Sequence, residues 1–130
     1  MVSKHVQEET NYYWKKFRSL SSNGISPKEF LDNLIYLNKS SIRQNKEIFS
    51  CIMKKLLDKR TFDIGYSRNL LMKYSYVFGG IIEYELIHNP KALSKALQFV
   101  LVSLSGRPHS KMFDFGVLAL NRFHKCLKNH

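Results

Sequence analysis

Apolar residues recur every three or four positions along almost the whole chain. This is the period of a helix that buries one face, and no alternating strand pattern competes with it. Six stripes of this kind follow one another, and their apolar residues are Val2, Val6, Tyr13, Phe17 and Leu20; Phe30, Leu31, Leu34, Ile35 and Leu37; Ile42, Phe49, Ile52, Met53, Leu56 and Leu57; Leu70, Tyr74, Val77, Phe78, Ile81 and Ile82; Leu93, Leu97, Val100, Leu101 and Leu104; and Met112, Phe113, Leu118, Leu120, Phe123 and Leu127. The sequence therefore predicts six helices of roughly 12 to 18 residues.

Turn and capping residues separate these stripes. The first helix is predicted to stop at residues 21–24, and Ser26, Pro27 and Glu29 have the spacing of a cap, a first helical position and a capping box. The other boundaries are expected at Ser40-Ser41, residues 63–65, Ser67, Asn89-Pro90, residues 106–108 and Ser110. The fifth helix also carries Ala92, Ala96, Phe99 and Val102 on its other faces, so we expect it to be buried nearly all round.

Six helices joined by short turns amount to three antiparallel helical pairs. Stacked pairs of this kind form an α-solenoid, whose extended faces bind other proteins. A compact six-helix bundle is the alternative. The chain has 130 residues, of which 44% are hydrophobic, so one domain or a piece of one with a packed core is expected.

The charge of the chain indicates an acidic partner. It has 21 Lys and Arg residues against 10 Asp and Glu, a formal net charge of +11. Nucleic acid, an anionic membrane or an acidic protein surface would each fit. The densest basic group is Lys54, Lys55, Lys59 and Arg60. Tyr12 and Trp14 are the aromatic candidates for stacking RNA bases, although a core or protein-contact role is favoured for them.

No residue constellation supports catalysis, a metal or a cofactor. Glu8 and Glu9 are adjacent and point about 100° apart on a helix, and no two of the five histidines have the spacing of a zinc-binding helix. Cys51 and Cys126 both fall in apolar helical patterns, which favours packing and a reducing compartment. The glycines at 79, 80 and 116 are expected to allow close approach of a neighbouring helix. The longest apolar run, residues 99–104, is far too short for a membrane span.

Several strings also resemble a known family. They are residues 5–11 (HVQEETN), residues 78–83 (FGGIIE), residues 110–112 (SKM), residues 115–116 (FG) and residues 119–123 (ALNRF). Together and in this order they resemble the central MIF-4G domain of the large Not scaffold subunit of the Ccr-Not deadenylase complex. The resemblance covers residues 4–127. The family often has Asp where this chain has Asn121, and the sequence of residues 19–26 and 59–67 differs from that of the family.

This resemblance implies an α-solenoid of HEAT-like pairs that performs no catalysis and uses no cofactor. The family domain has about five pairs, of which residues 1–130 would be the N-terminal three, within a much larger scaffold protein. It implies docking of a Caf/Pop-type deadenylase, a Dhh/Rck-type DEAD-box helicase and other Ccr-Not subunits, in mRNA deadenylation, decay and translational repression. Arg43, Lys46 and Phe49 match the region where the helicase would dock, although Phe49 also fits the buried stripe. Met112 and Phe113 are the candidates for the deadenylase.

Two other interpretations of the function stay open. One is a MIF-4G domain of a translation-initiation or splicing factor, and the other is direct RNA binding through the basic surface, as a secondary contact. The resemblance implies a location in cytoplasmic mRNA decay foci, with the nucleus as an alternative.

Overall fold

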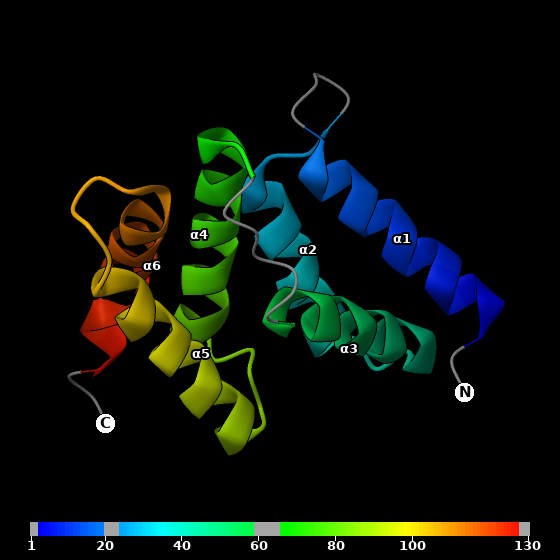
Figure 1. The fold of residues 1–130 in the computed structure, drawn as a ribbon. Coiled ribbons are helices and arrows are strands. Elements are labelled where there is room, and N and C mark those ends of the chain that lie inside the picture. Colours follow the sequence, from blue (N-terminus) through cyan, green and yellow to red (C-terminus); the bar gives the residue numbers. More distant parts are fainter. Residues whose placement is uncertain (1–2, 20–23, 59–65, 128–130) are drawn as a thin grey trace. The chain divides into compact units, whose positions relative to one another are not determined.

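The computed structural model describes residues 3–19, 24–58 and 66–127, without the side chains of Cys126 and Leu127. These ranges contain six helices and no strand, and Figure 1 shows them in chain order. They are α1 (Lys4–Arg18), α2 (Pro27–Lys39), α3 (Arg43–Leu57), α4 (Arg68–Glu83), α5 (Pro90–Leu104) and α6 (Lys111–Leu127). The prediction of an all-α fold of six helices is confirmed. Val2, Leu20 and the predicted breaks at residues 21–23 and 63–65 lie outside the described residues.

The predicted caps begin four of these helices, α2, α4, α5 and α6. The Ser26 Oγ accepts a hydrogen bond from the Glu29 amide at 3.1 Å, and Pro27 occupies the first turn of α2. The Ser67 Oγ accepts from the Leu70 amide in the same way at the start of α4. Each bond satisfies an amide that the first turn of a helix leaves without a partner. Short polar signals in the sequence therefore determine where these helices begin.

Asn89 makes two such bonds at the start of α5, and its removal is expected to weaken that helix. Its Oδ1 accepts from the amides of Lys91 at 2.8 Å and Ala92 at 3.2 Å. Asn89→Ala should lower the free energy of unfolding by about 1 kcal/mol, the usual contribution of a cap. Urea denaturation followed by circular dichroism measures this loss. Ser94→Ala, at an exposed position of the same helix, is the control. An equal loss of unfolding free energy in both variants would show that the Asn89 cap does not stabilise α5.

The end of α4 is closed without a glycine. Tyr84 is the C-cap, and Glu85 follows with a positive φ of 57°. The Leu86 amide donates to the Ile81 carbonyl at 2.9 Å, and the Glu85 amide donates to the Ile82 carbonyl at 3.2 Å. Leu86 and Ile81 are both buried, and apolar residues at these two positions commonly accompany this closing motif.

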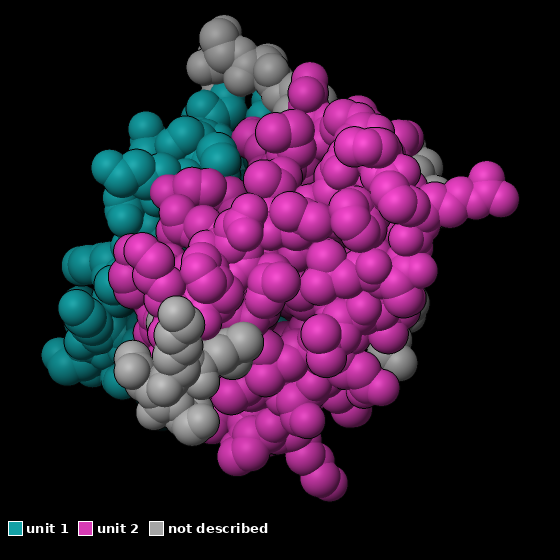
Figure 2. Space-filling view, turned by 90° about the vertical axis from the view of Figure 1, so that its left-hand side faces the viewer, with its two compact units in different colours: residues 1–61 teal, residues 62–130 magenta. Residues whose placement is uncertain are grey.

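The chain divides into two compact units, coloured separately in Figure 2. Unit 1 holds α1, α2 and α3 within residues 1–61, and unit 2 holds α4, α5 and α6 within residues 62–130. In unit 1, α1 and α2 both pack on α3, and in unit 2, α4 and α5 both pack on α6. The contacts of α1 with α3 and of α4 with α6 join helices that are two places apart in the chain. Stacking of successive helical pairs produces contacts of this kind.

The core of unit 1 centres on two fully buried rings. Phe17 of α1 and Phe30 of α2 are stacked, with ring centroids 4.3 Å apart. The other buried apolar residues of this unit are Val6, Leu31, Leu34, Leu37, Ile48, Phe49, Ile52, Met53 and Leu56. They are largely the predicted stripes, so the helical period in the sequence identifies this core correctly.

The core of unit 2 joins three rings from three helices. Phe78 of α4, Phe99 of α5 and Phe115 of α6 lie with their ring centroids 5.6 to 5.7 Å apart. Around this trio α4 and α6 approach closely at glycines. A Cβ built on Gly79 would lie 2.7 Å from the Ala119 carbonyl oxygen. Gly116 likewise faces α5, where such a Cβ would lie 3.0 Å from the Ser103 Cβ. The packing role predicted for these two glycines is confirmed.

The structure corrects three predictions of burial. Helix α5 is not buried nearly all round, because Leu101 and Val102 are 64% and 62% exposed. Ile42 caps α3 from an exposed position and does not belong to its buried stripe. On α6 the buried face is formed by Phe115, Gly116, Ala119 and Phe123, whereas the predicted Met112, Phe113 and Leu120 are half-buried and Leu118 is exposed. The helical period was right, but it overstated the buried part of α5 and α6 and placed Ile42 inside α3.

Candidate functional site

A groove lies between α1 and α3 in unit 1. Its volume is about 380 Å³, and it is lined by Gln7, Thr10 and Asn11 from α1 and by Cys51, Lys54 and Lys55 from α3. Thr10 is only 2% exposed, and its Oγ1 has no hydrogen-bond partner in the structure. The groove thus offers amide and ammonium donors around a buried hydroxyl, which suits a ligand rich in hydrogen-bond acceptors.

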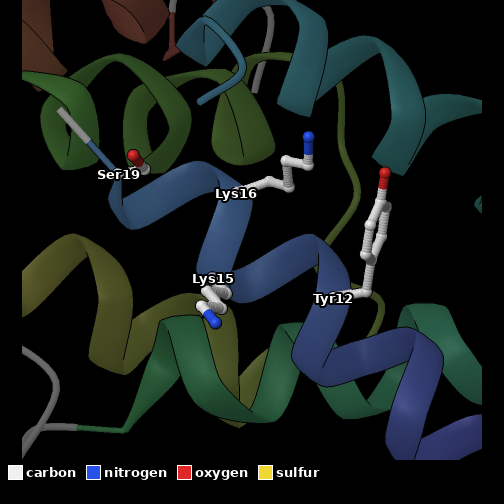
Figure 3. A pocket seen from close by; sticks show the side chains of 4 residues that line it. All are labelled: Tyr12, Lys15, Lys16 and Ser19. Carbon is white, nitrogen blue, oxygen red and sulfur yellow. The ribbon is translucent and has the colours of Figure 1, made fainter. Parts of the chain in front are cut away.

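A second hollow opens along α1. It has a volume of about 270 Å³ and is lined by Tyr12, Lys15, Lys16 and Ser19. Figure 3 shows that Tyr12 and Lys16 extend in the same direction from α1, while Lys15 leaves the helix in another. The Lys16 Nζ lies over the Tyr12 ring, 5.5 Å from its centroid. An ammonium above an aromatic face is a favourable cation–π arrangement.

Basic residues occupy the last turns of both α1 and α3. The last turn of α1 carries Lys15, Lys16 and Arg18, and the last turn of α3 carries Lys54 and Lys55. Cations at the carboxyl end of a helix are favoured by its dipole, so each end is stabilised locally. The Lys55 Nζ lies 5.9 Å from the Trp14 ring centroid, so the last turn of α3 lies beside α1 at Trp14. Lys59 and Arg60, the rest of the predicted basic group, lie outside the described residues.

Three tyrosines cluster beside the second hollow. The rings of Tyr12 and Tyr13 meet edge to face, with their centroids 6.0 Å apart. Burial raises the pKa of Tyr13, and the nearby Glu9, Tyr12 and Tyr36 raise it further. Tyr12 and Tyr36 are 57% and 63% exposed. Sequence reasoning missed Tyr36, because its place on the polar face of α2 gives no sign that it lies near α1.

The predicted helicase-docking residues on α3 are only partly available at the surface. Arg43 and Lys46 are exposed, and the Arg43 Nε lies 3.1 Å from the Glu47 Oε1 in an i,i+4 ion pair. Phe49 is 7% exposed and belongs to the core of unit 1. We therefore drop Phe49 as a contact residue, since its ring packs inside the unit that would have to present it. No partner is present, so docking at Arg43 and Lys46 stays a prediction.

The predicted deadenylase-docking residues lie in the first turn of α6. Met112 and Phe113 are both half-buried. Ser110 precedes them, and its Oγ accepts from the Phe113 amide at 3.2 Å, so this turn is capped as expected. Arg68 fixes the same region by pairing with Asp114 and by donating to the His109 carbonyl at 3.2 Å. The two side chains are therefore held in place but are only partly accessible, and their docking role also stays a prediction.

Two of the strings that carry the family resemblance meet in unit 2. Arg122 of α6 lies 3.2 Å from the Glu83 Oε1 of α4. Its guanidinium carbon also lies 4.1 Å from the centroid of the Tyr76 ring. Gly79 leaves room for the Arg122 stem, because a Cβ on that glycine would lie 2.8 Å from the Arg122 Cβ. Residues 78–83 and 119–123 thus pack against each other in unit 2.

The described residues form no metal-binding cluster. Within them, no three His, Cys, Asp or Glu side chains come close enough to hold a metal ion. Burial lowers the pKa of Lys73 on α4. Among the same residues, no helix is both long and apolar enough to cross a membrane. The features that remain are surfaces, which are suited to contact with other macromolecules.

A family comparison identifies the kind of protein that presents these surfaces. The model of the CCR4-NOT transcription complex subunit 1 TTP binding domain matches residues 1–130. The chain belongs to this family. Its resemblance to the Not scaffold subunit is therefore confirmed. The MIF-4G designation is not confirmed, because the matching family model describes the TTP binding domain.

Relatives from three organisms agree with this family. The chain is 31% identical over 115 residues to the CCR4-NOT transcription complex subunit let-711 of Caenorhabditis elegans, covering 88% of the chain and 4% of the relative. It is 26% identical over 122 residues to the general negative regulator of transcription subunit 1 of Saccharomyces cerevisiae, covering 94% and 6%. The protein of the same name in Schizosaccharomyces pombe is 30% identical over 128 residues, covering 98% and 6%. The chain thus spans only a small part of these relatives.

A solved structure agrees as well. The N-terminal domain of the yeast Not1 matches the whole chain with a TM-score of 0.84 and 25% sequence identity. The chain covers 24% of that structure. Its all-helical fold is thus the fold of part of a Not1 domain.

Proposed function

We propose that this chain is a non-catalytic docking segment of a Not1-type scaffold, which holds partner proteins of mRNA deadenylation, decay and translational repression. The observation that carries the proposal is the family match over residues 1–130. The surface supports it, because α5 exposes Leu101 and Val102 side by side and α1 and α3 expose basic side chains. Helices held in packed units lose little conformational entropy when they dock, which favours binding.

A TTP-type protein is the partner that the family description favours, since the matching model is named for TTP binding. The matched region covers all three helices of each unit, so a purified chain of 130 residues carries the whole matched surface. The test is a titration of a TTP polypeptide into the chain by isothermal calorimetry. A saturable one-to-one complex supports a TTP-type protein as a partner. The absence of any heat of binding at the concentrations reached would exclude it.

A Caf/Pop-type deadenylase and a Dhh/Rck-type DEAD-box helicase are the second set of partners we propose. They rest on the strings at residues 5–11 and 78–83, which resemble the family that docks them. The second RecA-like lobe of the helicase would meet the exposed Arg43 and Lys46, and the deadenylase would meet Met112 and Phe113. Pull-down with each purified partner tests the two contacts separately. Failure of both, together with binding of TTP, would assign the chain to TTP alone.

Arg43→Glu is expected to weaken helicase binding roughly tenfold, because it reverses an exposed charge at the edge of the proposed contact. The side chain is 93% exposed, so helix content should stay unchanged apart from the loss of a weak i,i+4 pair with Glu47. Fluorescence anisotropy with labelled helicase lobe gives the affinity. Arg107→Glu, at an exposed turn of unit 2, is the matched charge reversal. Wild-type affinity in Arg43→Glu would exclude Arg43 from the contact.

A further inference from the structure

The two hollows of unit 1 are both lined by residues of α1. Lys15 lines the hollow on α1, while the groove beside α3 contains Asn11, one turn before it on the same helix. Each hollow also has an aromatic ring next to an ammonium group: Lys16 over Tyr12 in one, and Lys55 over Trp14 beside the other. We call this the α1–α3 basic surface, and it consists of Tyr12, Trp14, Lys15, Lys16, Lys54 and Lys55.

We propose that the α1–α3 basic surface binds single-stranded RNA. Lysine ammonium groups along a surface neutralise successive phosphates, and exposed aromatic rings stack the bases between them. Tyr12 is 57% exposed, so one face of its ring is within reach of a base. The exposed Lys15 and Lys54 lie on the two helices that border the groove, where they can contact neighbouring phosphates.

Local charge favours an anionic ligand at this place. Of the carboxylates nearest along the two helices, Glu8 lies 4.0 Å from the Lys4 Nζ and Glu47 is paired with Arg43, while Glu9 lies near Tyr13. Asp58, at the C-cap of α3, is the acidic group that follows Lys54 and Lys55. The four lysines Lys15, Lys16, Lys54 and Lys55 therefore outnumber the two carboxylates Glu9 and Asp58 that border them.

The alternation of rings and ammonium groups favours RNA over an acidic protein segment. A protein carboxylate would use Lys15 and Lys54 but would gain little from the Tyr12 ring. A nucleotide uses both, because its phosphate pairs with a lysine while its base covers the ring. The contribution of the Tyr12 ring therefore distinguishes the two ligands. This inference does not depend on the proposed docking of TTP, deadenylase or helicase.

The first test measures binding of a fluorescein-labelled RNA of about fifteen adenosines, which is long enough to cross the surface. Anisotropy is recorded with the 130-residue chain over a series of salt concentrations. Lys15→Ala/Lys54→Ala should weaken binding about tenfold and reduce the slope of log K against log salt by about 1.4, because two phosphate contacts are lost. The control, Lys91→Ala/Lys95→Ala on α5, removes two exposed lysines from unit 2 and should change the affinity less than twofold.

The second test isolates the ring. Tyr12→Ala should weaken binding about tenfold, and Tyr12→Phe should restore it, because stacking needs the ring and not the hydroxyl. Tyr84→Ala, at a tyrosine of unit 2 that is 51% exposed, is the matched control and should bind like the wild type. Circular dichroism of every variant checks that the helices are intact. Equal weakening in Tyr12→Phe and Tyr12→Ala would show that stacking is not involved.

Three other results would overturn the inference. One is a dissociation constant for the RNA weaker than about 100 µM at low salt, the weak end of non-specific binding. Another is an equal loss of affinity in the two double-lysine variants, which would mean diffuse attraction by net charge. The third is tight binding of a polyglutamate peptide, sensitive to Lys15→Ala/Lys54→Ala but not to Tyr12→Ala, in the absence of RNA binding. That result would assign the surface to an acidic protein.

Discussion

Phe115→Ala is expected to lower the free energy of unfolding of unit 2 by about 4 kcal/mol, within the range for a buried phenylalanine. Phe115 is 1% exposed, and its ring contacts Phe78 of α4 and Phe99 of α5. Alanine at this position leaves a cavity where three helices meet, and the surrounding helices can fill it only in part. Urea denaturation monitored by circular dichroism should therefore show a lower midpoint with the helices still formed at zero denaturant.

Leu118→Ala is the control for this variant. Leu118 lies on the same helix and is 37% exposed, so its truncation opens no enclosed cavity. Its expected cost is below about 1 kcal/mol. Similar losses for the two variants would mean that the Phe78–Phe99–Phe115 cluster is not the centre of unit 2.

Gly79→Ala is expected to lower the free energy of unfolding by about 2 kcal/mol. Alanine usually stabilises the interior of a helix by about 1 kcal/mol relative to glycine. Here the added methyl would lie 2.7 Å from the Ala119 carbonyl oxygen and 2.8 Å from the Arg122 Cβ. Backbone cannot give way as the end of a flexible side chain can, so α4 and α6 must separate, and such overpacking costs about 1 to 3 kcal/mol.

Gly106→Ala gives the matched comparison. The nearest atom to a Cβ on Gly106 is the Ser103 carbonyl oxygen at 3.4 Å, an ordinary contact distance, and the residue is exposed. This variant should stay within about 0.5 kcal/mol of the wild type in the same urea denaturation. Destabilisation of Gly106→Ala as large as that of Gly79→Ala would show that loss of glycine itself, and not the approach of α6, is responsible.

Helix number and boundaries could be read from the sequence because they depend on local chemistry. The amide caps of Ser26, Ser67 and Asn89 act within three residues of the capping side chain, so their effect is visible without a tertiary structure. Burial of a given face depends instead on which helix lies beside it. Helix α5 is apolar on several faces, but the described neighbours cover only the face with Ala96, Val100 and Ser103.

The candidate site could be predicted only in part, for the same reason. The basic group on α3 and the aromatic group on α1 are each visible in the sequence, but nothing local indicates that Lys55 lies over Trp14. Tyr36 was missed because its nearness to Tyr13 is a contact between helices. Phe49 had the spacing of a surface triplet with Arg43 and Lys46, yet its ring completes the core. Spacing alone cannot distinguish an anchor for a partner from a residue that packs within its own unit.

Direct binding to a partner tests the central claim, that this chain acts by docking other proteins of the CCR4-NOT system. The most direct measurement is isothermal titration calorimetry of the purified 130-residue chain with a purified TTP polypeptide, deadenylase and helicase lobe in turn. The account predicts a one-to-one complex with at least one of them, with a dissociation constant in the micromolar range or tighter. No binding to any of the three by a chain whose helices are intact would contradict it.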